Sequence, residues 1–140
     1  MNNNKDELDV EVMYRALTEL NILSDFILIT GNINTLQLIS DDIKPDYDAI
    51  KNKFNEIKEI VYLENNFEIL RKKRNELLKE CDYLALPDYP HENPEIRTAW
   101  KIYRQQLRDL PNNNESIKDM KLDDNDYDNL IGVVWPTPPS

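Results

Sequence analysis

The chain has 140 residues, a formal charge of −10 and one cysteine, which is enough for one domain with a hydrophobic core or for two small lobes. Residues 1–45 carry 3 Lys/Arg against 8 Asp/Glu, and residues 111–140 carry 2 against 6. Because acidic chains are repelled by phosphate groups, nucleic acid and anionic membranes are poor partners. A single cysteine excludes an internal disulfide, and no apolar run in the sequence is long enough to span a bilayer.

Residues 1–44 are predicted to form a small β-rich lobe. Residues 8–14 alternate between apolar and polar side chains, as a half-buried edge strand would. Two β-rich runs follow at residues 22–30 and 33–39, and Gly31 and Asn32 between them suit a two-residue hairpin turn. We therefore expect a small antiparallel sheet of up to three strands.

A long helix is predicted to begin after Pro45, where Asp46 is a good N-cap. No Gly or Pro occurs from residue 47 to residue 80, and apolar residues recur there at helical spacing in two series that are offset by one residue. The pattern allows either one continuous helix or a break near Asn65 and Asn66. The two series are Ile50, Phe54, Ile57 and Val61, then Ile60, Leu63, Phe67, Leu70, Leu77 and Cys81.

A proline-rich turn at residues 84–94 is predicted to lead into a second helix. Asn93 is a good N-cap, and Pro94 suits the first helical position. Pro111 is predicted to end this helix. The short connection between the two helices favours an antiparallel pair. The apolar stripe of the second helix consists of Ile96, Trp100, Tyr103, Leu107 and Leu110.

The last segment is predicted to combine a linker and a docked tail. Residues 112–129 are rich in Asn, Asp, Lys and Ser, which is typical of a loosely held acidic linker. Residues 130–135 are mostly apolar and are followed by a proline-rich end, so we expect this tail to dock. The chain as a whole is predicted to be α+β, with a β-rich lobe (1–44), a helical hairpin (45–111), and an acidic linker with a Trp-Pro tail (112–140).

No catalytic, cofactor or metal site is predicted. His91 is the only histidine and lacks the further ligands that a metal site needs. The aspartates at 41–48 lack the glycine and the glutamate of a calcium loop. Motifs for nucleotide binding and for a serine or cysteine nucleophile are missing from the sequence. The basic run at residues 71–74 is flanked by glutamates and is expected to be a salt-bridged helix surface. We expect a non-enzymatic protein without a cofactor.

Three motifs follow one another in the second half of the chain: RKKRNELLKECDYLALPDYP, AWKIYRQQLRDLP and VVWPTPP. This succession resembles the C-terminal module of phage tail fibre assembly chaperones and related tail assembly chaperones, over about residues 68–138. In that pattern an Arg-rich helix leads through a Leu-Pro-Asp turn to an Ala-Trp helix and a Trp-Pro tail. Two features depart from it: Tyr83 stands where the family usually has Trp, and the spacer before Trp135 is long and acidic.

The resemblance implies a viral protein that binds a tail fibre, tail or capsid protein and promotes its folding or assembly in the host cytoplasm. The alternative is a permanent virion component, such as a minor capsid, tail or fibre-tip subunit. Formation of a homo-oligomer is open.

The residues of the motif are expected to act mainly as a scaffold. The aromatic stripe would pack against Leu77, Leu78 and Cys81, while Arg74, Arg104 and Arg108 would reach Asp82, Asp88 or helix-end carbonyls. The alternative role is partner binding, because aromatic and Arg residues dominate interface energetics. The candidate partner-binding residues are Trp100, Tyr103, Arg104, Arg108 and Trp135.

Overall fold

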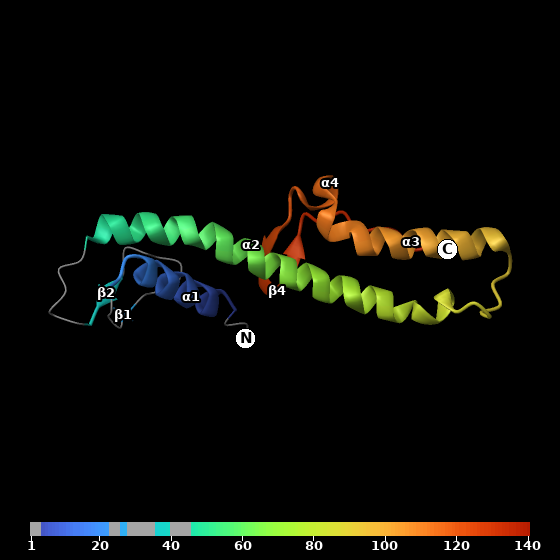
Figure 1. Cartoon of the computed structure of the whole chain (residues 1–140), viewed down its shortest axis with the longest axis horizontal. Coiled ribbons are helices and arrows are strands. Elements are labelled where there is room, and N and C mark those ends of the chain that lie inside the picture. The colour runs from blue at the N-terminus through green and yellow to red at the C-terminus, as the bar shows by residue number, and fades with distance from the viewer. Residues whose placement is uncertain (1–3, 23–25, 28–35, 40–45) are drawn as a thin grey trace. The chain divides into compact units, whose positions relative to one another are not determined.

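The computed structural model describes residues 4–22, 26–27, 36–39 and 46–140 (Figure 1). Long helices and a small antiparallel sheet confirm the predicted α+β class. The elements in chain order are α1 (Asn4–Glu19), β1 (Phe26–Ile27), β2 (Gln37–Leu38), α2 (Tyr47–Glu80), the 3₁₀ turn η2 (Asp82–Ala85), α3 (Pro94–Asp109), the 3₁₀ turn η3 (Leu110–Asn112), α4 (Asn114–Ile117), β3 (Lys121–Asp123) and β4 (Asp126–Ile131).

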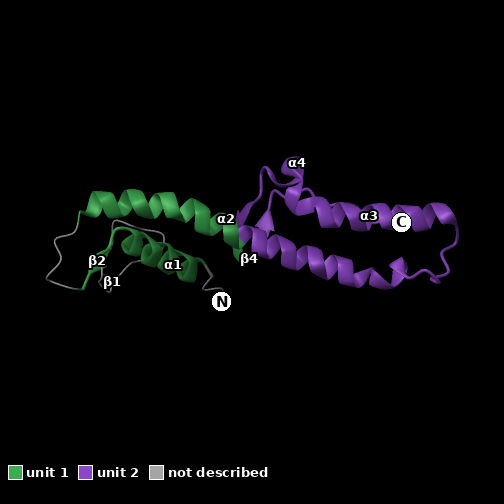
Figure 2. Cartoon of the chain, in the orientation of Figure 1, with its two compact units in different colours: residues 1–65, 125–128 green, residues 66–124, 129–140 purple. Residues whose placement is uncertain are grey.

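The chain forms two compact units (Figure 2). Unit 1 consists of residues 1–65 and 125–128, and unit 2 consists of residues 66–124 and 129–140. Helix α2 contributes its first part to unit 1 and the rest to unit 2. These units have other boundaries than the predicted division into 1–44, 45–111 and 112–140, which stays a prediction about domains.

The N-terminal segment is helical, so the prediction of an edge strand at residues 8–14 is wrong. In α1 the residues Leu8, Val12 and Ala16 are buried at intervals of four, as on one face of a helix. Val10 and Tyr14, which the strand prediction placed on the same side as Leu8, are 41% and 55% exposed. A segment of seven residues is compatible with both the two-residue period of a strand and the 3.6-residue period of a helix. The continuation of the buried series to Ala16 distinguishes the helix.

A buried carboxylate joins α1 to the first part of α2. Asp9 is 1% exposed, and the Tyr62 hydroxyl donates a hydrogen bond of 2.6 Å to its Oδ1. Burial, and then this hydrogen bond, raise the pKa of Tyr62, so the phenol stays neutral. Arg15 also pairs with Glu64 across the two helices, at 3.3 Å. Unit 1 therefore contains a polar contact within its apolar core.

The described part of the predicted hairpin is antiparallel. Phe26 lies opposite Leu38, and Ile27 lies opposite Gln37. The predicted turn at Gly31 and Asn32 falls outside the described residues, as does Pro45.

Helix α2 is continuous over Tyr47–Glu80, which decides against a break near Asn65 and Asn66. Asp46 caps it as predicted, because its Oδ1 accepts a hydrogen bond from the Ala49 N–H at 3.1 Å. The first apolar series is buried, but Ile60 and Leu63 of the second are 52% and 51% exposed. The helix is therefore continuous across the offset between the two series, and these two apolar side chains of the second series lie on the surface.

Unit 2 contains the predicted helical hairpin. The last part of α2 and helix α3 run antiparallel (Figure 1), and Asn93 caps α3 by accepting a hydrogen bond from the Ile96 N–H at 2.9 Å. Their shared core is a cluster of buried residues with larger side chains packed around it. The buried members are Cys81, Leu84, Tyr103 and Leu107, and the surrounding residues are Leu77, Leu78, Tyr89, Trp100 and Trp135.

Residues 112–129 are folded, so the prediction of a loosely held linker is wrong. They contain α4 and the two strands β3 and β4, which pair in a second sheet. Asn113 caps α4 through the Ser116 N–H at 3.3 Å, and Leu122 is only 7% exposed. Short elements closed by side-chain caps need few apolar residues, which is why composition alone was misleading.

The tail is docked, as predicted. Gly132 has φ +80°, and a Cβ atom there would lie 1.9 Å from the Asp119 carbonyl oxygen, so only glycine fits. Two residues later the Val134 N–H donates a hydrogen bond to the Ser116 carbonyl at 2.9 Å. These contacts bring Trp135 onto the core cluster of unit 2.

Candidate partner-binding site

The five predicted partner-binding residues all belong to unit 2. Trp100 and Tyr103 meet edge to face, with ring centroids 5.7 Å apart. Tyr103 is 5% exposed, and burial, followed by the nearby Cys81 and Glu80, raises its pKa. Trp100 and Trp135 pack around the same cluster, which confirms the predicted packing. Their role toward a partner stays a prediction.

Arg104 of α3 forms hydrogen bonds with the end of α2 and the residues that follow it. Its guanidinium donates from Nη1 to the Leu78 carbonyl at 2.9 Å and to Cys81 Sγ at 3.1 Å, and from Nη2 to Asp82 Oδ1 at 2.8 Å. The side chain is largely buried, with 8% of the residue exposed. Burial alone would lower the pKa of Arg104, but hydrogen bonds to Asp82 and Cys81 outweigh it and leave the pKa raised. A flat, forked cation suits this set of acceptors.

The other two arginines of the motif differ in position. Arg74 donates to the Arg108 carbonyl near the end of α3, at 3.3 Å, which confirms the expected contact with a helix-end carbonyl. The exposed Arg108 side chain donates to Gln105 Oε1 at 3.5 Å, rather than to Asp82, Asp88 or a helix-end carbonyl as predicted. Arg108 is therefore the arginine among the predicted anchors that a partner could reach directly.

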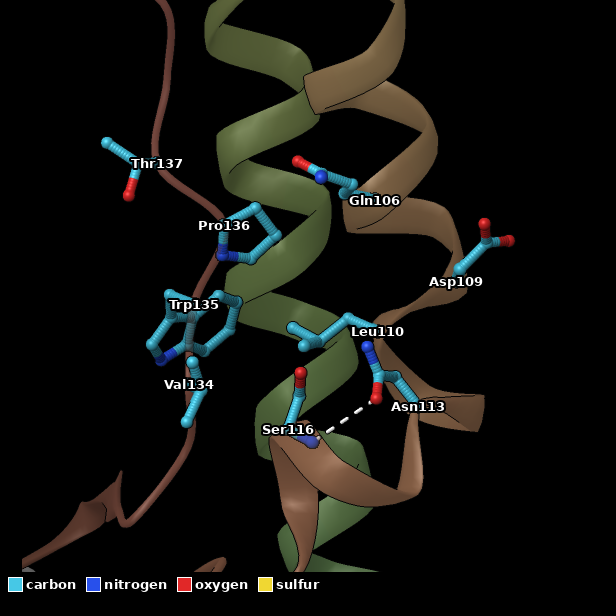
Figure 3. Close-up of a pocket in the computed structure, with 9 residues that line it drawn as sticks. All are labelled: Gln106, Asp109, Leu110, Asn113, Ser116, Val134, Trp135, Pro136 and Thr137. Carbon is cyan, nitrogen blue, oxygen red and sulfur yellow. Dashed lines mark hydrogen bonds between the residues drawn. The ribbon is translucent and has the colours of Figure 1, made fainter.

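A cavity of about 460 Å³ lies between the tail and the end of α3 (Figure 3). Trp135 and Pro136 border it on the tail, and Leu110 faces them from η3. Lys73 of the basic run lies 5.4 Å from the centroid of the Trp135 ring, a cation–π distance. The remaining lining residues are Gln106, Asp109, Asn113, Ser116, Val134 and Thr137.

The proline-rich turn is fixed by a residue that the sequence reasoning missed. Arg97 donates to three backbone carbonyls of the turn, at 3.4 Å to Leu86, 3.4 Å to Pro87 and 2.7 Å to Tyr89. Leu86, within the same turn, is 53% exposed. The sequence contains a signal for this contact: Arg97 lies one turn into the helix that follows the proline-rich segment. A side chain at that position can reach back to unpaired carbonyls of the turn.

Within the described ranges, the structure contains no group of three or more His, Cys, Asp or Glu side chains that could hold a metal ion. Among the same residues, no helix has both the length and the apolar character needed to cross a bilayer.

Comparison with known proteins agrees with the geometry of unit 2. Residues 67–140 match the model of the phage tail assembly chaperone protein family, whereas searches of curated proteins and of solved structures found no match. The match covers more than half of the chain and begins one residue after unit 2 does, at 67 against 66. The chain therefore belongs to the phage tail assembly chaperone protein family, which is not an enzyme family and whose role is in phage tail assembly.

Proposed function

We propose that this chain binds a tail fibre protein, or another tail protein, of a phage-type virus and promotes its folding or assembly in the host cytoplasm. The observation that carries the proposal is the coincidence of the family match with one compact unit: apart from residues 125–128, the matched residues 67–140 all lie in unit 2. A unit with its own buried cluster can present a surface of fixed shape to a partner.

Unit 2 has apolar surface to offer. Tyr83, Leu86 and Val134 are 53%, 53% and 64% exposed. A chaperone of this kind would cover apolar or strand-edge surface on a fibre subunit until assembly buries it. In this proposal Arg108 contacts the partner, while the buried Tyr103 and Arg104 hold the surface in shape.

Co-expression tests the proposal. The tail fibre gene and the other tail genes of the same phage would each be expressed with this chain, without it, and with an unrelated acidic protein of similar size. We expect soluble, assembled product of at least one tail protein to rise only with this chain, and a complex with that protein to be isolated. Unchanged yields for every tail protein, with no complex, would overturn the proposal.

Quantitative mass spectrometry of purified particles separates this function from that of a permanent virion subunit. A long acidic spacer with a stiff proline tail would suit a permanent subunit that reaches across to a neighbour, but the spacer is folded in the structure. We therefore expect the chain to be missing from the finished particles. A fixed copy number relative to the major capsid protein would instead establish a structural subunit.

A further inference from the structure

We propose that the proline-rich turn between α2 and α3 is a docking surface for an apolar protein segment flanked by lysine or arginine. We call it the tip surface and define it by Tyr83, Leu86 and Pro87. Assigning the segment to a tail protein rests on the proposed function, whereas the chemistry of the segment follows from the turn itself.

The tip surface exposes two large apolar side chains next to each other. Tyr83 and Leu86 are each 53% exposed, while Leu84 between them is 8% exposed and belongs to the core cluster. Side chains three residues apart eclipse in a 3₁₀ turn, so Tyr83 of η2 and Leu86 at its C-cap share one face. Contiguous exposed apolar surface, unlike scattered single residues, marks interaction sites.

Hydrogen bonds and ring contacts within the turn fix the conformation of the tip surface. Arg97 binds three carbonyls of the turn, and His91 Nε2 lies 2.8 Å from the Leu84 carbonyl oxygen. The Tyr89 ring meets the Tyr83 ring edge to face, at 5.4 Å between centroids, and also the His91 ring, at 4.6 Å. A surface fixed in advance loses little conformational entropy when a partner binds, which favours affinity.

The surroundings of the tip surface are acidic. Residues 79–97 contain five carboxylates against two basic residues, Lys79 and Arg97, and all five of the acidic residues are exposed. The guanidinium of Arg97 is engaged with carbonyls of the turn. The guanidinium of Arg104 is largely buried and pairs with Asp82. Interfaces bring opposite potentials together, so the complementary segment carries basic residues beside its apolar ones. The five are Glu80, Asp82, Asp88, Glu92 and Glu95.

A peptide-binding experiment on the full-length chain tests this. Two sets of probes would be used: overlapping short peptides that cover the tail and tail fibre proteins of the same phage, and synthetic peptides that alternate leucine with either lysine or glutamate. The variant Tyr83→Ser/Leu86→Ser removes both apolar side chains. Ile102→Ser on α3 is the matched control, because Ile102 is 54% exposed in the same unit.

The leucine–lysine peptide should bind, and the leucine–glutamate peptide should not. Binding should fall at least about tenfold in the double variant, as expected for loss of central apolar anchors, and should weaken at high salt. Ile102→Ser should bind like the wild type. Equal binding by the double variant, an equal loss in Ile102→Ser, or no preference for lysine would overturn the proposal. The proposal would also be overturned if the wild-type chain formed a dimer and the double variant did not, because a second copy of the chain would then occupy the tip surface.

The outcome separates this inference from the proposed function. If the leucine–lysine peptide binds through Tyr83 and Leu86 but no tail protein gains yield, the tip surface stands and the proposed function fails. If tail protein yield rises equally with the wild type and the double variant, and the peptides bind both equally, the proposed function stands and the tip surface is refuted.

Discussion

Unit 1 and unit 2 each pair α2 with a second helix, but different buried charges hold the pairs together. In unit 1 the buried group is the carboxylate of Asp9, which accepts a hydrogen bond from Tyr62. In unit 2 it is the guanidinium of Arg104, which binds a carbonyl, a thiol and a carboxylate. The unit that the family model matches is the one in which arginine side chains bind the backbone.

The comparison shows what the arginine side chains of unit 2 contact. Arg74, Arg97 and Arg104 donate to carbonyls of the chain itself, where lysine could not reproduce the fork. Such residues specify a backbone path rather than a partner. These contacts agree with the predicted scaffold role of the motif arginines, which stays a prediction, and we propose that partner contacts fall to exposed apolar residues and to Arg108.

The largest effect is expected from Leu107→Ala, since Leu107 is fully buried in the cluster of unit 2. It should lower the free energy of unfolding by about 2–5 kcal/mol. Both tryptophans lie in unit 2, so their fluorescence during denaturant unfolding reports that unit. Met13→Ala in the buried core of unit 1 is the matched control and should shift this transition less. Equal shifts would mean that the two units unfold as one.

Arg104→Ala should cost about 2–3 kcal/mol in the same measurement, because it leaves the Leu78 carbonyl and Asp82 without a charged donor. Arg104→Lys should recover only part of this loss, since an ammonium cannot span the same acceptors. Arg108→Ala, at an exposed position, should change stability by no more than about 0.5 kcal/mol. If Arg108→Ala proved as costly as Arg104→Ala, the distinction between scaffold and surface arginines would be wrong.

Tyr62→Phe should destabilise unit 1 by about 1–3 kcal/mol, because the buried Asp9 loses a hydrogen bond. Hydrogen exchange of the α1 amides measures this, and tryptophan fluorescence should change little.

The same variant tests a pH dependence. Burial and Asp9 raise the pKa of Tyr62 in the folded chain, so its contribution to stability is fully present below the unfolded value of about 10. The contribution is lost as pH rises above that value, because the unfolded chain releases the proton first. The protection of α1 should therefore decline above about pH 10 in the wild type and decline less in Tyr62→Phe. Identical profiles would contradict the assignment.

The smallest effect is expected at the helix caps, one in each unit. Asn93→Ala and Asp46→Ala each remove a side-chain acceptor from a helix N-terminus and should each cost about 0.5–2 kcal/mol. Asn93→Ser keeps an acceptor and should retain most of the stability. The loss in Asn93→Ala should appear in tryptophan fluorescence, and that in Asp46→Ala in amide exchange at the start of α2. A larger loss at one cap would show that the unit concerned depends on more than the local hydrogen bond.

The sequence by itself determined the parts that depend on local signals. The absence of Gly and Pro, the caps Asp46 and Asn93, and the apolar stripe of α3 identified the two long helices, and the motif identified the family. The docking of Trp135 was also predictable, because an apolar run beside prolines is rarely left in water.

Only the tertiary structure decided the features for which the local pattern allows more than one environment. In the structure residues 4–19 form a helix and residues 112–129 are folded, while Arg104 is buried and Leu86 is exposed. The physical reason is that a short pattern or a charged side chain has several acceptable local environments. The choice among them depends on groups distant in sequence, such as the Asp9 carboxylate for Tyr62 and the Leu78 carbonyl for Arg104.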